Sequence, residues 1–203
     1  MLLKINLFAI SLLPIFLLTG PFLPNIIVSI SSIIFLFLII KKYNLNFLNS
    51  NFFLFYLFFL FLFLLSSLVS DNIYNSLEHS LFYCRFIFFS IFLSLLVKKY
   101  EEISKYIFYI LLITFSFLII DSYIQFIFKS NIFLMPLLHG RPSSIFGEEF
   151  ILGSYLSRLF PLLIALAYFK NYFKNYNEII LIFISFFIFI TIYLTGERVA
   201  IFN

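Results

Sequence analysis

Four arginines are the residues of this chain best suited to binding an anion: Arg85, Arg141, Arg158 and Arg198. A guanidinium group presents five N–H donors in a planar fork that matches a phosphate or a carboxylate, and it stays charged when water is removed. All four lie in or beside apolar stretches, and a charge within a membrane span costs roughly 2.5–3.5 kcal/mol. A shared cavity that binds an anion would explain all four together, and we favour this interpretation.

The alternative is that each arginine pairs with an acid and only holds helices together. The acids available for such pairs are Asp121, Glu78, Glu148 and Glu197. Asp121 is the natural partner for Arg158, and a structural Asp–Arg clamp explains that pair as well as a functional site does. Both interpretations stay open on the sequence.

A stripe of polar residues supports a polar interior near Asp121. Asp121, Ser122, Gln125 and Lys129 follow one another at spacings that place them on one face of a helix. Such a face cannot point to lipid, so we expect it to line the interior of a helix bundle or a wet cavity.

The single cysteine and the two histidines predict no disulfide and no metal site. Cys84 is the only cysteine, so no intramolecular disulfide can form. His79 and His139 are too few and too far apart in the sequence to indicate a metal site. We expect no metal and no cofactor, and these residues identify no catalytic group.

The composition predicts the elements that must position these residues. Hydrophobic residues make up 64% of the 203 residues and charged residues 11%, with a mean hydropathy of +1.13. A soluble domain carries roughly 25% charged residues. In lipid every backbone group must be paired within its own segment, so the apolar runs are expected to be helices. The sequence predicts an all-α, polytopic membrane helix bundle that forms a single transmembrane helical domain over residues 1–203.

About seven apolar runs are long enough, or nearly so, to cross a bilayer core of about 30 Å. The predicted spans are residues 4–19, 23–40, 52–69, 80–97, 106–128, 150–169 and 178–195. The longest predicted outer loop covers residues 129–149, and the two acids Glu148 and Glu149 are expected in the first turn of the helix that follows.

The lysines predict the orientation of these spans. Alternating crossings place eight of them on one side: Lys4, Lys41, Lys42, Lys98, Lys99, Lys105, Lys170 and Lys174. By the positive-inside rule this side is cytoplasmic. The N-terminus is then cytoplasmic, and all four arginines map to the outer side or to the outer half of a helix.

Two segments near the arginines resemble a known family. The stretch from Arg141 to Leu156 reads RPSSIFGEEFILGSYL, and the stretch from Leu194 to Ala200 reads LTGERVA. In order and spacing they resemble two motifs of the bacterial O-antigen ligase and O-antigen polymerase family. The resemblance covers about residues 115–203, and Glu197 stands where the family more often has serine.

The resemblance implies a membrane glycosyltransferase of the GT-C type that acts in lipopolysaccharide biosynthesis at the outer face of the bacterial inner membrane. The donor would be an undecaprenyl-diphosphate-linked glycan. The acceptor would be lipid A core for a ligase or a second lipid-linked glycan for a polymerase. Membrane lipids are expected around the protein, and nucleic acid is not an expected partner. The residues expected to bind the diphosphate are Arg141, Arg158 and Arg198, supported by Asp121, Gln125, Arg85 and Glu197.

One departure from the family concerns the catalytic group. Family members usually carry a catalytic histidine in a large outer loop beyond the region that resembles LTGERVA, and this chain has no counterpart before Asn203. We therefore interpret the chain as an N-terminal fragment and leave its catalytic residue unassigned. Two other functions stay open: a flippase or transporter of lipid-linked oligosaccharides, and an inactive truncated remnant.

Overall fold

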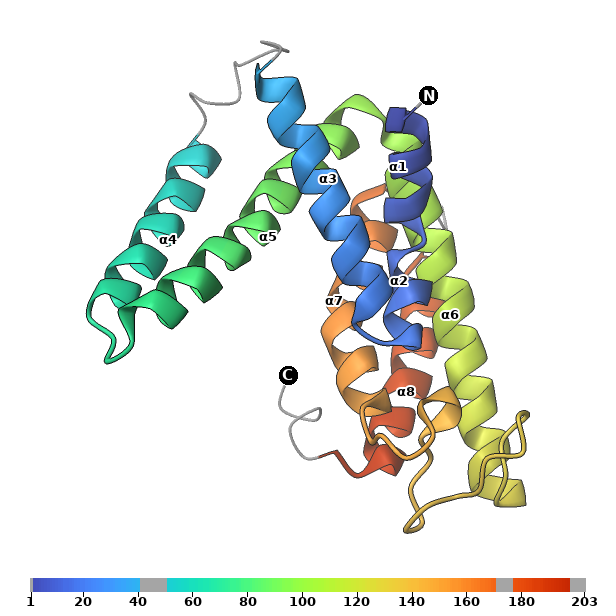
Figure 1. The fold of residues 1–203 in the computed structure, drawn as a ribbon. Coiled ribbons are helices and arrows are strands. Elements are labelled where there is room, and N and C mark those ends of the chain that lie inside the picture. Colours follow the sequence, from blue (N-terminus) through green and yellow to red (C-terminus); the bar gives the residue numbers. More distant parts are fainter. Residues whose placement is uncertain (1, 41–50, 171–176, 198–203) are drawn as a thin grey trace. The chain divides into compact units, whose positions relative to one another are not determined.

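The computed structural model describes residues 2–40, 51–170 and 177–197, and within these ranges the chain is all α-helical (Figure 1). The eight α-helices are α1 (Leu2–Ser11), α2 (Leu13–Phe16), α3 (Phe22–Ile40), α4 (Asn51–Leu68), α5 (Ile73–Lys99), α6 (Glu101–Phe128), α7 (Leu152–Lys170) and α8 (Asn177–Thr195). Short 3-10 turns cover Leu17–Thr19 and Ser144–Phe146. The predicted all-α class is confirmed.

Three of these helices are long and apolar enough to cross a membrane: Phe22–Ile39 in α3, Ile73–Lys99 and Glu101–Phe128. Shorter apolar helical segments cover Phe53–Leu68, Leu152–Tyr168 and Ile182–Thr195. The described helices therefore suit a multi-pass membrane protein.

The first predicted span, residues 4–19, is not one helix. The structure divides it into α1, α2 and a 3-10 turn. Pro14 explains the interruption, because it has no N–H to donate to the carbonyl of Ile10 and its ring crowds the preceding turn. Pro14 instead lies in the first turn of α2, where a missing N–H costs little.

The contacts of the chain group into two compact units. Unit 1 comprises Met1–Leu13 and Thr19–Ile103, and unit 2 comprises Pro14–Leu18 and Ser104–Asn203. The prediction that residues 1–203 form a single domain stays a prediction.

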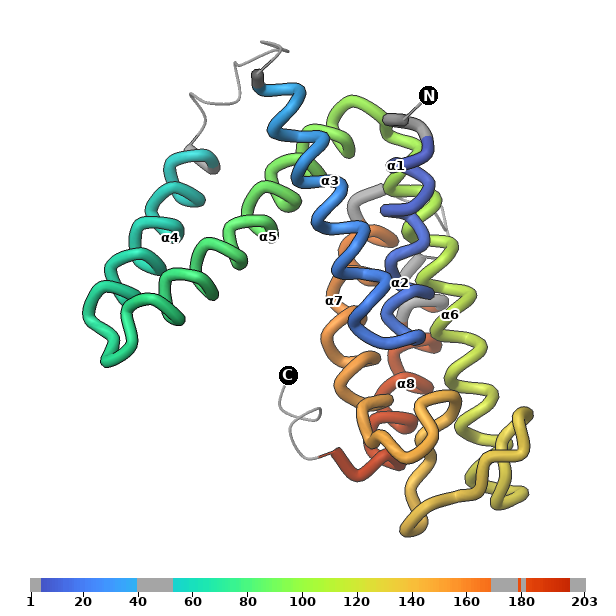
Figure 2. Tube along the Cα trace, viewed as in Figure 1, coloured from blue at the N-terminus to red at the C-terminus, as the bar shows by residue number. Residues whose placement is uncertain are grey.

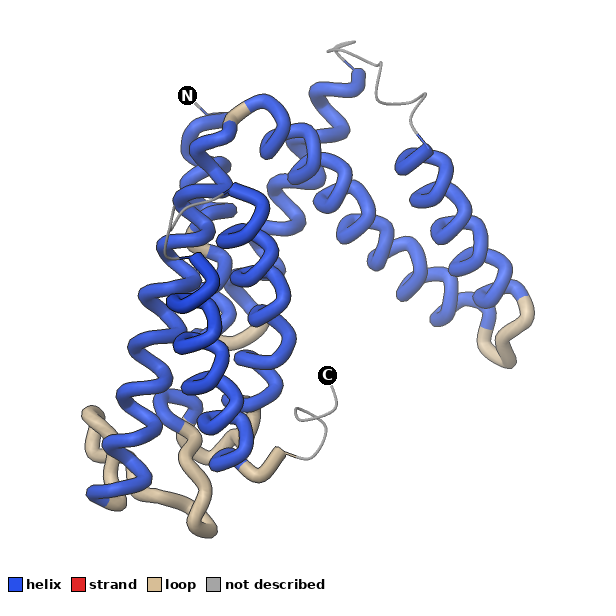
Figure 3. The backbone as a smooth tube through the Cα atoms, turned by 180° about the vertical axis from the view of Figure 1, so that it is seen from behind, coloured by secondary structure: helices blue, strands red, loops and turns tan. Residues whose placement is uncertain are grey.

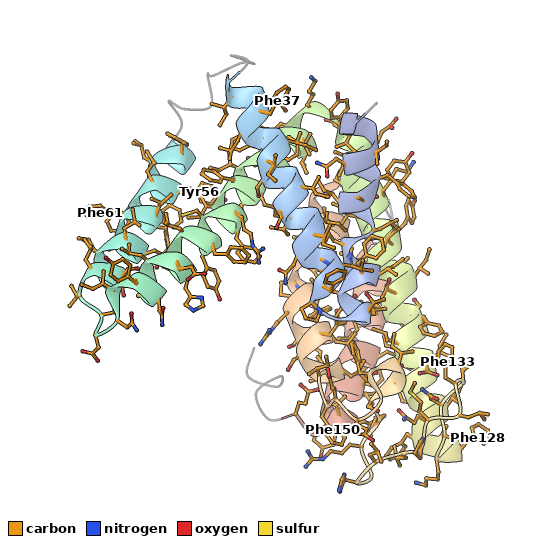
Figure 4. All side chains as sticks on the ribbon, in the orientation of Figure 1. Phe37, Tyr56, Phe61, Phe128, Phe133 and Phe150 are labelled. Carbon is orange, nitrogen blue, oxygen red and sulfur yellow. The ribbon has the colours of Figure 1, made fainter. Side chains whose placement is uncertain are left out.

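Unit 1 is built around α5, which packs against both α3 and α4 (Figure 2). The rings of Phe63 and Tyr83 stack at 6.5 Å between α4 and α5, and Ser67 hydrogen-bonds to Ser80 across the same pair. The other side of α4 is lined with exposed apolar side chains such as Phe61, which points away from α5 in Figure 4. A helix with such a surface is suited to contact with lipid.

Unit 2 has its apolar core between α6, α7 and α8. The buried core residues are Leu111, Phe115, Leu118, Leu152, Leu156, Leu163, Ile188 and Ile192. α7 packs along α8, and the Tyr155 hydroxyl donates to the Pro14 carbonyl at 2.7 Å. The connection from α6 to α7 gathers at the end of the bundle where α6 and α8 end and α7 begins (Figure 3). This end of unit 2 holds most of the predicted site residues.

Candidate functional site

Asp121 anchors the loop that follows α6. Its side chain is fully buried. One carboxylate oxygen accepts the backbone N–H of Ile132 at 3.0 Å, and the other accepts the Ser144 hydroxyl at 2.5 Å and the Asn131 amide at 3.5 Å. Three donors from the loop thus converge on a single buried carboxylate, which satisfies it without an arginine.

Gln125 holds the same loop one helical turn further along α6. Its carbonyl oxygen accepts the backbone N–H groups of Ser143 and Ser144 at 2.9 and 2.8 Å. Its amide nitrogen donates to the Pro136 carbonyl at 3.2 Å. The Gln125 side chain is fully buried, so both ends of its amide are used to fix loop backbone that would otherwise be unpaired.

Asn131 organises the first turn of the loop, and the sequence reasoning missed it. Its side-chain oxygen accepts the N–H groups of Phe133 and Met135 at 3.0 and 2.7 Å, and its amide nitrogen donates to the Ser144 carbonyl at 2.9 Å. An asparagine just after a helix end commonly accepts the N–H two residues on. That local signal was present in the sequence, but the long-range bond to Ser144 had no sequence signal.

The predicted polar stripe is confirmed for three of its four members. Asp121, Ser122 and Gln125 are fully buried, whereas Lys129 is exposed and has a backbone φ of 64° just beyond the end of α6. The three buried members bind backbone and side chains of their own unit. Asp121 and Gln125 therefore fix the loop, whereas the Ser122 hydroxyl donates to the Leu118 carbonyl of α6 itself.

The predicted pair of Asp121 and Arg158 is wrong. Arg158 is exposed on α7, whereas Asp121 is buried under the loop. Arg158 follows Ser154 by four residues, so the two lie on the same face of α7. This face points toward the end of α8, because the Ser154 hydroxyl donates to the Glu197 carboxylate at 2.5 Å.

Glu197 closes the N-terminal end of α7. Its carboxylate accepts the backbone N–H of Gly153 at 2.7 Å and that of Ser154 at 2.8 Å, in addition to the Ser154 hydroxyl. A helix N-terminus leaves such N–H groups unpaired and carries a partial positive charge, so a carboxylate there is stabilising. The prediction that Glu148 and Glu149 lie in the first turn of this helix is wrong, because α7 begins at Leu152 and both exposed acids precede it.

Arg141 lies against the backbone just before Glu197. A Cβ atom added to Gly196 would come within 3.0 Å of the Arg141 Nε and 3.3 Å of its Cζ. Gly196 also has a φ of +64°, which side chains rarely adopt. The glycine of the LTGERVA segment therefore gives room to the arginine of the RPSSIFGEEF segment. Arg198 lies outside the described residues.

Arg85 belongs to unit 1 and is bound there. It is half-buried, and its guanidinium donates to the Ser29 hydroxyl at 3.1 Å and to the Asn25 side-chain oxygen at 3.2 Å. Its partners are neutral, so the pairing with Glu78 considered from the sequence is not formed. The structure thus brings Arg141, Arg158 and Glu197 to one end of unit 2 but holds Arg85 in a different set of contacts.

Neither histidine takes part in the contacts of Arg85 or in those that join Arg141 and Glu197 to the end of unit 2. His79 is exposed on α5, and His139 is exposed in the loop between α6 and α7, with its ring 6.1 Å from that of Phe150. Among the residues that the structure describes, no three His, Cys, Asp or Glu side chains gather as metal ligands.

The chain matches no protein-family model, no curated protein sequence and no solved structure.

Proposed function

We propose that this chain is a bacterial membrane glycosyltransferase of the O-antigen ligase or polymerase kind. Its donor is an undecaprenyl-diphosphate-linked glycan, and its acceptor is lipid A core or a second lipid-linked glycan. The observation that carries the proposal is the meeting of the two segments that resemble the family motifs. Glu197 joins the LTGERVA segment to Gly153 and Ser154, and Arg141 packs on Gly196.

The charges at this end suit a diphosphate. Arg141 and Arg158 are exposed, and neither guanidinium forms a hydrogen bond with any of the residues described. When the glycan moves, the acceptor oxygen bonds to the anomeric carbon and the bond from that carbon to the diphosphate breaks. Negative charge then grows on the leaving diphosphate, and fork-shaped guanidinium donors stabilise it. The group that takes the acceptor's proton is unassigned.

The roles of the arginines are testable by conservative replacement. Changing Arg141, Arg158 or Arg198 to lysine keeps the charge but removes the planar fork. Each change is expected to lower glycan transfer roughly tenfold, because one charge-assisted contact is lost. The measurement is transfer from an undecaprenyl-diphosphate-linked glycan by membranes that contain equal amounts of each variant.

Lys129→Arg is the matched control for these variants, because Lys129 is an exposed cation at the start of the same loop. This change should leave transfer unaltered. Near-normal transfer by all three arginine variants would remove the diphosphate role and leave these residues as structural charges.

The proposal also requires the loop of residues 129–149 on the outer side, with about seven spans and a cytoplasmic N-terminus. Ser143 is fully buried, so the exposed His139 is the better reporter position. In a Cys84→Ser background, cysteine at position 139 should react with a membrane-impermeant thiol reagent while the inner membrane is intact. Reaction only after that membrane is permeabilised would contradict the orientation.

A further inference from the structure

Arg85 is held by an unusual set of neutral groups between α3 and α5. Its two terminal nitrogens donate to Ser29 and Asn25 on α3. The guanidinium carbon lies 3.8 Å from the ring centre of Phe82 and 4.9 Å from that of Phe86. Hydrogen bonds and aromatic faces thus stabilise the cation, but none of these groups carries a negative charge.

Among the residues that the structure describes, no carboxylate pairs with Arg85, so its positive charge stays uncompensated by them. The two hydrogen bonds use two of the five N–H donors of the guanidinium. Its Nε is buried without a partner, and the side chain as a whole is half-buried. A cation in an apolar helix is costly unless a counter-charge approaches it. The donors that remain on the terminal nitrogens are suited to an anionic ligand.

The surroundings of Arg85 indicate where such a ligand carries its charge. Asn25 lies in the first turn of α3, at the end of the helix opposite to Lys41 and Lys42 in the sequence. The Asn25 side-chain oxygen accepts from Arg85, which leaves its amide N–H groups available as further donors beside the guanidinium. If α3 spans a bilayer, its first turn reaches the region of the lipid phosphates, and the Asn25 side chain brings donors to that level beside the guanidinium.

Apolar side chains frame these donors. Phe22 is 72% exposed and Ile26 39% exposed on α3, and Phe82 is 61% exposed on α5. A soluble anion would gain nothing from this apolar rim, whereas the acyl chains of a lipid would pack on it. The combination of a cation, amide donors and an apolar rim is complementary to a lipid that bears a phosphate.

We propose that Arg85, Asn25 and the surrounding apolar side chains form a binding site for the phosphate group of an anionic phospholipid. The inference uses residues of unit 1 alone and stands whether or not the chain transfers glycans. Arg85 then binds a structural or regulatory lipid, in addition to any donor bound in unit 2.

Native mass spectrometry of the purified full chain tests this site. The protein is exchanged from phosphatidylglycerol into a mild detergent, and lipid adducts are counted. The wild type should retain phosphatidylglycerol, and Arg85→Gln should lower the retained fraction roughly tenfold, since its charge-assisted contacts are lost. Diacylglycerol, which has the acyl chains but no phosphate, should be retained equally poorly by both proteins.

Two further variants keep the test decisive. Lys129→Gln removes an exposed cation elsewhere and should leave retention unchanged. Asn25→Ala keeps the Arg85 cation and should lower the retention of phosphatidylglycerol less than Arg85→Gln does. It provides a second test of the site if Arg85→Gln fails to fold. Equal retention by the wild type, Arg85→Gln and Asn25→Ala would overturn the site. Full displacement of the lipid by inorganic phosphate would assign the site to a soluble anion and overturn its lipid specificity.

Discussion

Replacing Asp121 by leucine is expected to lower the free energy of unfolding by about 3 kcal/mol or more, because the donors that converge on this carboxylate would be buried without an acceptor. Those donors are the Ile132 N–H, the Ser144 hydroxyl and the Asn131 amide. The loop should detach from the end of α6 in this variant. Unfolding by a denaturing detergent gives the stability, and limited proteolysis of residues 129–149 gives the state of the loop.

Asp71→Leu is the matched control for this change. Asp71 is exposed in the turn between α4 and α5, so the same substitution there should change the stability little. Asp121→Asn should be milder than Asp121→Leu, because an amide still offers one acceptor and the Ser144 hydroxyl can reverse its direction. If Asp121→Leu unfolds at the same concentration of denaturing detergent as the wild type, the loop is not held through this carboxylate.

Replacing Glu197 by alanine is expected to free the start of α7 from the end of α8. The N–H groups of Gly153 and Ser154 and the Ser154 hydroxyl would lose their shared acceptor. Hydrogen bonds to a charged group contribute about 1.5–3 kcal/mol each, so exchange of these two amide hydrogens should accelerate on the order of a hundredfold. Hydrogen exchange followed by mass spectrometry measures this directly.

A carboxylate placed near the same helix end provides the comparison. Glu149 precedes α7 and is exposed, so Glu149→Ala removes a neighbouring charge without removing a hydrogen-bond acceptor of Gly153 or Ser154. Exchange at these two amides should then stay close to that of the wild type. Equal acceleration by both variants would mean that general charge, and not the contact made by Glu197, protects the start of α7.

The positions of most apolar helices could be predicted from the sequence because hydropathy alone defines them. The predicted span 23–40 corresponds to Phe22–Ile40, and the predicted span 178–195 corresponds to Asn177–Thr195. The predicted span 80–97 is shorter than α5, which covers Ile73–Lys99, because the first turns of α5 are polar. A helix can extend beyond the apolar core, and hydropathy does not register that extension.

The candidate site could be predicted only in part. The burial of Asp121 and Gln125 follows from their helical spacing, since polar groups avoid lipid. Their partners are backbone groups of a loop with several left-handed residues, among them Ser144 with a φ of 52°. Such a loop path has no periodic signature in the sequence. The Asp121–Arg158 pairing failed for this reason, because charge alone suggested an arginine where the structure supplies backbone donors.

Photolabelling tests whether a polyprenyl diphosphate binds at the end of unit 2 that holds Arg141 and Arg158. The probe is a polyprenyl diphosphate with a photoreactive group beside the diphosphate, and the labelled peptides of the full chain are identified by mass spectrometry. We expect labels within residues 141–158 and in the segment that follows α8, and we expect Arg141→Lys to lose the label. Labels confined to the lysine-bearing ends, such as residues 98–105, would contradict this expectation.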